Sequence, residues 1–211
     1  MVRLSEEKKT VKVLVCICHH VGNLIDICLE SVQKSFLEGI ELRVVVVTST
    51  DRVFDGVITI RDQGGPAHKR NVAVNLYGHD SDYIIFLDDD VEVSTTCIWN
   101  LVDSMERTPT CGMGFCKILN MERRNIFDDC GSWITNSGFL FARAQNNQED
   151  SGQYDSPCQI LASKSATCIV RHSAFKEAGS FDSSYYILWE ETDLAWRVWL
   201  SGHSVYYFHT A

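Results

Sequence analysis

The apolar run from Val11 to Cys18 is the feature that most constrains the fold of this chain. It is nearly continuous and rich in valine, as expected for a strand that is buried on both faces. Apolar residues at helical spacing follow from Leu24 to Phe36, and a second β-branched run spans Leu42 to Val47. A strand, a helix and a strand of these lengths predict a right-handed crossover between parallel strands. The fold class is therefore α/β, with ligands expected at the carboxyl ends of the strands.

Local signals predict the next elements. Asn23 is the expected N-cap of the first helix and Gly39 its expected end. A short strand over 57–60 precedes a helix over 67–77, which Gly78 should end, and a later helix is expected from Ser94, its cap, to Met105. The second half of the chain predicts strands over 111–119, 160–170 and 204–208, helices over 171–178 and 194–200, and a polar binding loop or insertion over 120–157.

Two further signals in these segments concern ligands. Gly64-Gly65-Pro66 opens the second helix, where a backbone can approach an anion closely, and Lys69 and Arg70 in its first turn could reach a phosphate. Solvated helix residues are the alternative. Gly112-Met113-Gly114 is too short a pattern to indicate a dinucleotide-binding fold.

Three consecutive carboxylates, Asp88, Asp89 and Asp90, follow the apolar run over 83–87. Adjacent negative charges raise one another's pKa values, so this triplet is costly unless a cation lies among the side chains. If Asp88 and Asp90 alternate across a strand end, their oxygens form a hard, partly open site for Mg or Mn against a diphosphate. An acidic turn that faces water is the simpler alternative.

Charge and cysteine content exclude some functions. The net charge of −9 argues against a nucleic-acid surface, and no apolar run is long enough to span a membrane. The nine cysteines are odd in number, most lie in apolar runs and no signal peptide opens the chain, which predicts reduced thiols in a cytoplasmic protein. Residues 16–20 (Cys-Ile-Cys-His-His) offer a weaker alternative, a zinc site, but no second ligand pair completes it.

A second acidic segment, Glu190-Glu191-Thr192-Asp193, precedes the apolar helix over 194–200. Every residue of that helix except Arg197 is apolar, so Arg197 needs a partner. Asp193 lies four residues earlier, and we expect the two to form an ion pair. Glu190 and Glu191 then stand at the positive end of the helix, where carboxylates are favoured.

Taken in order, these segments resemble the family 2 glycosyltransferases of the GT-A fold. The matching segments are residues 28–32, Gly64–Pro66 with Arg70-Asn71, residues 86–90, Gly179–Asp182, and residues 190–194 with Trp196-Arg197 and Gly202. The resemblance covers nearly the whole chain from Val11. It implies a Rossmann-like, mostly parallel sheet flanked by helices with a smaller acceptor-side portion. It further implies one catalytic domain over 1–211, with a nucleotide-binding half over 11–108 and an acceptor-side half over 109–211.

The resemblance also implies roles for individual residues. Asp90 is expected to be the direct metal ligand, with Asp88 nearer the ribose and the metal shell, and the cation is Mn or Mg. Glu191 stands where the family has the aspartate that acts as general base. The remaining substrate-binding residues implied in this way are Asp51, Arg70, Asp88, Asp89, Glu190 and Asp193.

The implied activity is metal-dependent, inverting transfer of a sugar from a nucleoside diphosphate sugar to a hydroxyl acceptor, which is a glycan, a lipid-linked molecule or a small molecule. Two turns depart from the family pattern. After the first strand, residues 17–20 stand in place of the family's Pro-Thr-Tyr-Asn stretch, and after the second strand Asp51 is the nearest substitute for the family's aspartate. The chain also ends at Ala211, before a late histidine of the family, so we expect a shortened protein.

Two other functions stay open. One is a non-catalytic nucleotide- or carbohydrate-binding module with the same fold, and the other is a nucleotidyltransferase, which would leave the second acidic segment without a role. The expected location is cytoplasmic, with peripheral membrane association left open.

Overall fold

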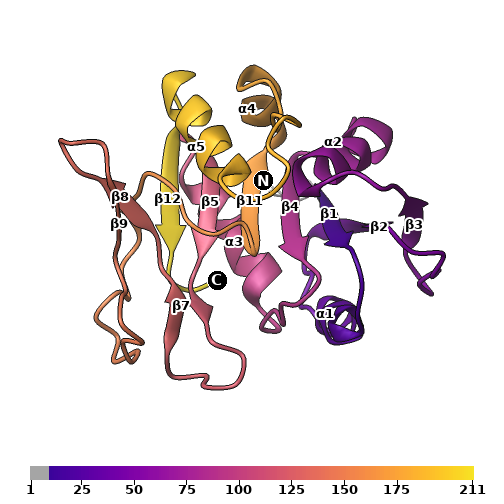
Figure 1. The fold of residues 1–211 in the computed structure, drawn as a ribbon, viewed down its shortest axis with the longest axis horizontal. Coiled ribbons are helices and arrows are strands. Elements are labelled where there is room, and N and C mark those ends of the chain that lie inside the picture. The colour runs from indigo at the N-terminus through magenta and orange to yellow at the C-terminus, as the bar shows by residue number, and fades with distance from the viewer. Residues whose placement is uncertain (1–9) are drawn as a thin grey trace, which may run out of the picture.

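The computed structural model describes residues 10–211, which form an eight-stranded sheet between two layers of helices (Figure 1). The strand order is β10-β12-β5-β11-β4-β1-β2-β3, and two short two-stranded sheets, β6-β7 and β8-β9, lie outside it. The helices are α1 (Leu24–Gln33), α2 (Pro66–Tyr77), α3 (Cys97–Arg107), α4 (His172–Glu177) and α5 (Glu190–Leu200). The strands are β1 (Val11–His19), β2 (Ile40–Thr48), β3 (Ile58–Arg61), β4 (Tyr83–Asp88), β5 (Cys111–Cys116), β6 (Ile118–Leu119), β7 (Phe127–Asp129), β8 (Ser132–Ile134), β9 (Leu140–Ala142), β10 (Cys158–Gln159), β11 (Thr167–Arg171) and β12 (Ser204–Phe208).

The sheet is mostly parallel, which confirms the predicted α/β class. β1 pairs in parallel with β2 and β4, β2 with β3, and β5 with β12. β11 is inserted antiparallel between β4 and β5, and β10 runs antiparallel to β12 at one edge. The chain therefore crosses from its first parallel strands to its last ones through a strand of opposite direction.

Alternation along the strands supplies a core on each face of the sheet. In β1, Leu14 and Cys16 pack towards α2, α4 and α5, whereas Val13, Val15 and Ile17 pack towards α1 and α3. All five side chains are almost completely buried. This explains why the run that begins at Val11 is apolar at nearly every position, since neither face of a central parallel strand reaches water.

Register brings the polar ends of these strands together. Cys18 pairs with Asp88 across β1 and β4, and His19 pairs with Thr48 across β1 and β2. Because β1, β2 and β4 are parallel, their carboxyl ends lie at one edge of the sheet, as predicted from the sequence.

The second helix agrees with its predicted bounds, ending at the Gly78 C-cap, but the first helix does not. α1 ends at Gln33, not near Gly39, because the N–H of Phe36 donates to the carbonyl of Thr95 (2.7 Å) and the chain turns away. α3 begins at Cys97 with Thr96 as N-cap, so the expected Ser94 cap is wrong; the Ser94 carbonyl instead accepts from the N–H of Cys97 in a preceding turn (3.0 Å).

Three later elements also differ from the expectation. The predicted strand over 111–119 divides into β5 and β6, and that over 160–170 is reduced to β11, because Ile160 bonds to Val205 and Lys164 to the Asp129 side chain. α5 begins at Glu190, so the two glutamates lie in its first turn. The helix is not buried all round, since Trp196 and Leu200 face solvent. None of the helices within 10–211 has the length and apolar character needed to cross a membrane.

The glycines of β5 allow close packing above the sheet. A Cβ added at Gly112 would lie 2.7 Å from the Cβ of His203, 2.8 Å from Cγ1 of Val198 and 3.0 Å from the Cβ of Ala174. These neighbours belong to α4, to α5 and to the segment before β12. The short glycine pattern therefore has a packing role, which brings α4 and α5 down onto the strand.

We expect Gly112→Ala to lower the free energy of unfolding by about 1–3 kcal/mol, since the new methyl group has no space. Urea denaturation measures the change. In the Gly112→Ala background, Val198→Ala should cost less than it does alone, because it removes the nearest side-chain methyl group. Equal costs in both backgrounds would contradict this packing account.

Candidate active site

Arg70 joins the two acidic segments that the sequence places about a hundred residues apart. Its side chain is 1% exposed; Nη1 donates to Oε1 of Glu190 (2.9 Å) and Nη2 to Oδ1 of Asp88 (2.9 Å). Nη2 also donates to Oγ of Ser165 (3.0 Å). These bonds hold the first turn of α2, the end of β4 and the first turn of α5 around one cation.

Aromatic rings complete the surroundings of this guanidinium. Phe181 and Phe86 lie beneath it, with ring centroids 5.2 and 6.0 Å from Cζ. Nε of Arg70 and Oε2 of Glu190 are buried without a hydrogen-bond partner among residues 10–211. Sequence reasoning placed Arg70 at a phosphate, whereas the structure encloses its guanidinium between protein carboxylates.

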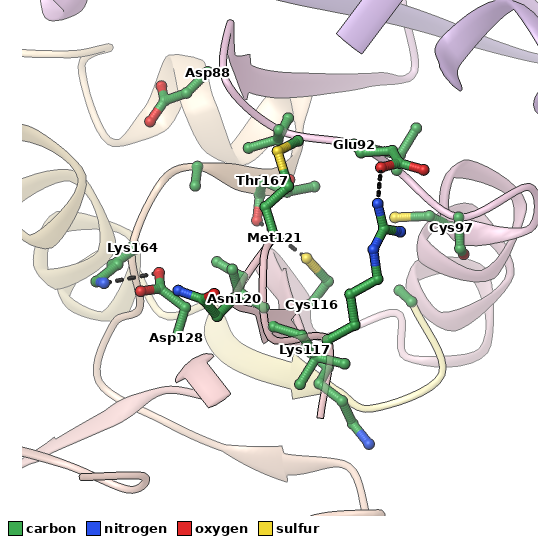
Figure 2. A pocket seen from close by; sticks show the side chains of 18 of the residues that line it. Asp88, Glu92, Cys97, Cys116, Lys117, Asn120, Met121, Asp128, Lys164 and Thr167 are labelled. Atoms are coloured by element: carbon green, nitrogen blue, oxygen red, sulfur yellow. Dashed lines mark hydrogen bonds and ion pairs between the residues drawn. The ribbon is translucent and has the colours of Figure 1, made fainter. Parts of the chain in front are cut away.

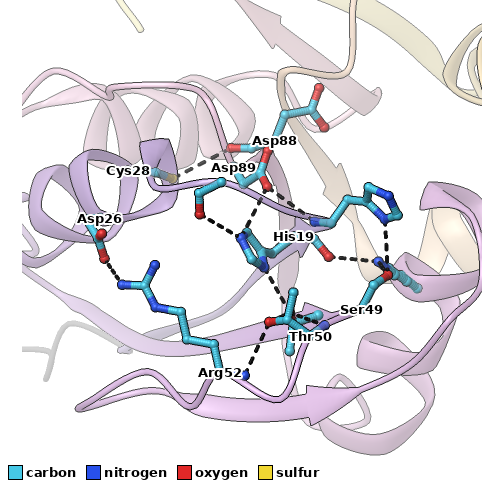
Figure 3. Close-up of polar contacts among 12 residues, drawn as sticks. His19, Asp26, Cys28, Ser49, Thr50, Arg52, Asp88 and Asp89 are labelled. Atoms are coloured by element: carbon cyan, nitrogen blue, oxygen red, sulfur yellow. Dashed lines mark hydrogen bonds and ion pairs between the residues drawn. The ribbon is translucent and has the colours of Figure 1, made fainter.

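The aspartate triplet occupies three different environments, because β4 ends at Asp88 and Asp89 and Asp90 lie in the following turn. Asp88 contacts Arg70 through one oxygen. Asp89 accepts from the backbone N–H of His20 (3.3 Å) and lies 4.0 Å from Nε2 of His19 (Figure 3). Burial raises the pKa of Asp89. Asp90 is exposed, and no hydrogen bond or ion pair from the described residues reaches it. The sequence suggested that Asp88 and Asp90 alternate across a strand end. They do not, because the strand ends at Asp88.

Buried polar bonds fix the ends of β1 and β2. His19 Nδ1 lies 2.8 Å from Oγ1 of Thr48, and Lys69 Nζ donates to the carbonyl of His19 (2.7 Å) and to Oγ of Ser49 (2.6 Å) (Figure 3). Lys69 is buried, and that burial lowers its pKa. The ammonium group that could have reached a phosphate is therefore used to hold two strand ends. Asp51, 81% exposed, pairs with Arg61 (2.6 Å) at the rim.

Glu190 and Glu191 are adjacent, yet their environments differ. Glu190 is buried against Arg70. For Glu191, burial raises the pKa to about 7, and the negative charges of Glu190 and Asp88 act in the same direction, while its own backbone N–H and Arg70 oppose the shift. A carboxyl group with a pKa near neutrality at a cluster of this kind is suited to take up a proton.

The predicted ion pair on α5 is confirmed. Arg197 donates through Nε to Oδ2 of Asp193 (3.0 Å) and through Nη2 to the same oxygen (2.5 Å). Its Nη1 donates to the carbonyls of Ser180 (2.7 Å) and Ala178. The pair therefore fixes the turn between α4 and α5 to the start of α5.

The segment between that turn and α5 approaches the glycine pair. A Cβ added at Gly65 would lie 2.3 Å from the carbonyl oxygen of Tyr186, so the close approach predicted for a ligand is made here by the chain's own backbone. Leu188 and Trp189 have φ values of 71° and 70°, which bulky residues rarely adopt. Strained backbone directly before Glu190 is typical of a functional segment.

A cavity of about 630 Å³ opens beside the triplet (Figure 2). Asp88 and Asp90 line it, together with residues 116–121 and 164–167 in part. Two cationic side chains that sequence reasoning missed, Arg124 and Lys164, also line it. Nothing in their sequence spacing marks them, because both lie in irregular segments that only the tertiary fold brings to Asp88.

Metal-binding chemistry is limited within residues 10–211. No three side chains of histidine, cysteine, aspartate or glutamate gather there at a point that could hold an ion. The zinc site considered for residues 16–20 is therefore not formed by this part of the chain. All nine cysteines are free, and all are buried or half-buried.

The chain is similar to known proteins in its structure but not in its sequence. No family model matches the chain, and no curated protein matches its sequence. GalNAc-T7, in a crystal structure with UDP, GalNAc and Mn2+, has a TM-score of 0.72 at 16% identity, over 96% of this chain and 43% of that chain. S. aureus TarS residues 1–349, in complex with UDP, has a TM-score of 0.65 at 16% identity, over 95% of this chain and 59% of that chain.

The chain thus spans less than two thirds of either protein. At these identities the similarity shows the fold, which is that of GT-A glycosyltransferases.

We expect Arg70→Met to lower the free energy of unfolding by about 3–5 kcal/mol, because Glu190 would be left buried without its cation. Glu190→Gln in the same chain should restore part of that loss. Urea denaturation of the single and double variants provides the measurement. A double variant no more stable than Arg70→Met would show that the pair does not act as a unit.

We expect Glu191→Gln to stabilise the fold at pH 8 by about 2–3 kcal/mol and to have little effect near pH 5. A folded pKa of about 7, above the usual 4.5, means that the wild type loses stability as pH rises through this interval, whereas glutamine does not titrate. Urea denaturation at both pH values tests this. Glu38→Gln, at an exposed position, is the control. A variant less stable than wild type at pH 8 would contradict the raised pKa.

Proposed function

We propose that this chain is a glycosyltransferase of family 2 type, which transfers a sugar from a nucleoside diphosphate sugar to a hydroxyl acceptor with inversion and with a divalent cation. The observation that carries the proposal is that Arg70 bonds to both Asp88 and Glu190, which brings the aspartate triplet and the Glu190-Glu191 segment together at the carboxyl edge of the sheet. The GT-A fold and the UDP bound in both structural neighbours support the choice of donor.

The residues present fit a cation of the Mg or Mn kind. Both Asp88 and Asp90 line the cavity, Asp90 is exposed, and no hydrogen bond from the described residues reaches Oδ2 of Asp88. Two carboxylates are sufficient, because such ions commonly complete their shell with water and substrate phosphates. A cation bound there would neutralise the charge that develops on the departing diphosphate.

Glu191 is the proposed general base. Inversion requires a group that removes the acceptor proton as the sugar is attacked from the face opposite the leaving group. A pKa of about 7 lets the carboxylate form exist at physiological pH while it retains enough basicity to accept that proton. Burial raises this pKa, so the same side chain in water would be a weaker base.

Glu190 and Asp193 have positioning roles in this proposal, as does Arg70. Arg70 and Glu190 are enclosed and bonded to each other, and Asp193 is bonded to Arg197. They set the position of α5, and thereby of Glu191, relative to Asp88. Asp51 at the rim and Asp89 in the turn remain the proposed contacts to the nucleotide. We further propose that 11–108 bind the nucleotide and that 109–211 bind the acceptor.

Two measurements, made on the wild type and on two variants, test the function. UDP, GDP and TDP are titrated with and without Mn by calorimetry, and release of the nucleotide from the corresponding sugar donors is then followed. We expect Asp90→Ala to remove the Mn dependence of nucleotide binding, and Glu191→Gln to retain binding while lowering turnover by about 10²–10⁴-fold.

Wild-type turnover in either variant would contradict the assigned roles. Nucleotide binding that survives with no turnover in the wild type would favour the alternative, a non-catalytic binding module. Failure to bind any nucleotide would refute the proposed donor class.

A further inference from the structure

The 630 Å³ cavity lies on one side of Asp88 and Asp90, and the predicted nucleotide contacts lie on the other. In the sheet, β4 stands between β1 and β11. The cavity is lined by the segments that follow β4 and β5, by the segment that precedes β11, and by Thr210 and Ala211, whereas His19, Thr48 and Asp51, at the ends of β1 and β2, do not line it. A nucleotide bound over β1 and β2 would therefore leave this cavity to a different ligand.

Lys164 is held close to Asp88 by the backbone. Its N–H donates to Oδ2 of Asp129 (2.8 Å), and two residues later the carbonyl of Ala166 accepts from the N–H of Asp88 (3.0 Å). Within the part of the chain that the structure describes, its ammonium group pairs only with Asp128 (2.8 Å), and the side chain is 54% exposed (Figure 2). The lysine is thus fixed at its base, while its paired tip is accessible to solvent.

Arg124 has a similar arrangement on another wall of the cavity. Among residues 10–211 its one ion pair is with Glu92, and its side chain is 67% exposed. In Figure 2, Glu92 and Lys164 lie on opposite sides of the view, with Thr167 and Met121 between them. Lys117, by contrast, is 14% exposed and bonded to both Asp150 (2.7 Å) and Asp155 (2.5 Å), so it is held by the protein.

The two exposed pairs are weak, and an incoming anion can replace the carboxylate in each. Single ion pairs in contact with water contribute little to stability, since both side chains lose freedom and the charges are screened. A phosphate group offers several strong acceptor oxygens to guanidinium and ammonium groups, which bind it through charge-assisted hydrogen bonds.

We propose that Arg124 and Lys164 form an anion subsite that selects hydroxyl acceptors carrying a phosphate or similar anionic group. The proposal rests on the proposed function, because it identifies the cavity as the acceptor side of a sugar transferase. The hydroxyl end of the acceptor would then lie at Asp88, whose charge acts on the proposed base Glu191, while Arg124 and Lys164 hold the charged end in the cavity.

Calorimetry with matched ligands tests the subsite. Glucose 6-phosphate and glucose, which share their hydroxyl groups and differ in charge, are titrated into the wild type and into Lys164→Gln, Arg124→Gln and the double variant. Lys12→Gln and Arg107→Gln are the controls, because each pairs with a carboxylate at the protein surface and neither lines the cavity. UDP with Mn is titrated into every protein.

We expect the wild type to bind glucose 6-phosphate at least tenfold more tightly than glucose, and the double variant to lose this preference. The controls should retain it, and the UDP affinity should change by less than twofold throughout. Equal binding of the two sugars by the wild type, or no detectable binding of either, would overturn the subsite.

A double variant that weakens UDP while leaving the sugar phosphate unaffected would also overturn the proposal, since the cations would then serve the donor diphosphate. If the wild type binds none of UDP, GDP and TDP, the proposed function is refuted instead. The ratio of the affinities for glucose 6-phosphate and glucose tests the subsite independently of the nucleotide titration.

Discussion

The buried guanidinium of Arg70 is the constraint on which the candidate site depends. A cation removed from water is tolerated only when anionic groups surround it at hydrogen-bond distance. Asp88 and Glu190 supply these groups at 2.9 Å, and each comes from a different element of the fold. The end of β4 and the start of α5 are consequently fixed relative to α2. Any arrangement that moved one of them would leave a charge in the protein interior without compensation.

The same constraint separates the chemistry of two neighbouring glutamates. Glu190 faces the cation and is occupied by it. Glu191, one residue along the helix, is half-buried and does not bond to Arg70, and the loss of water around it shifts its pKa towards neutrality. One side chain therefore supports the structure and the other is available for proton transfer, although the two residue types are identical. The two side chains leave the first turn of α5 in different directions and so enter different environments. The environment determines that one has a structural role and the other a pKa suited to proton transfer.

The sequence was sufficient for the parts of the molecule that local rules govern. Nearly continuous apolar runs and β-branching predicted the parallel strands, and a spacing of four residues predicted the Asp193–Arg197 pair. The enclosure of Arg70 could not be read in the same way, because its partners lie 18 and 120 residues away. Lys164 was missed for a related reason, since the strand expected over 160–170 was interrupted by tertiary bonds that no local pattern records.

Chain connectivity gives the antiparallel strand β11 a consequence for the order of folding. β1 and β2 are joined by a short crossover, so their contacts close small loops, whereas β4 acquires its second neighbour, β11, only after some eighty further residues of chain. Contacts of such sequence separation carry a larger entropic cost of loop closure and form late in folding. During synthesis, α2 emerges from the ribosome long before α5 does. The site is thus among the last regions to assemble, and an intact site reports that the whole chain has folded.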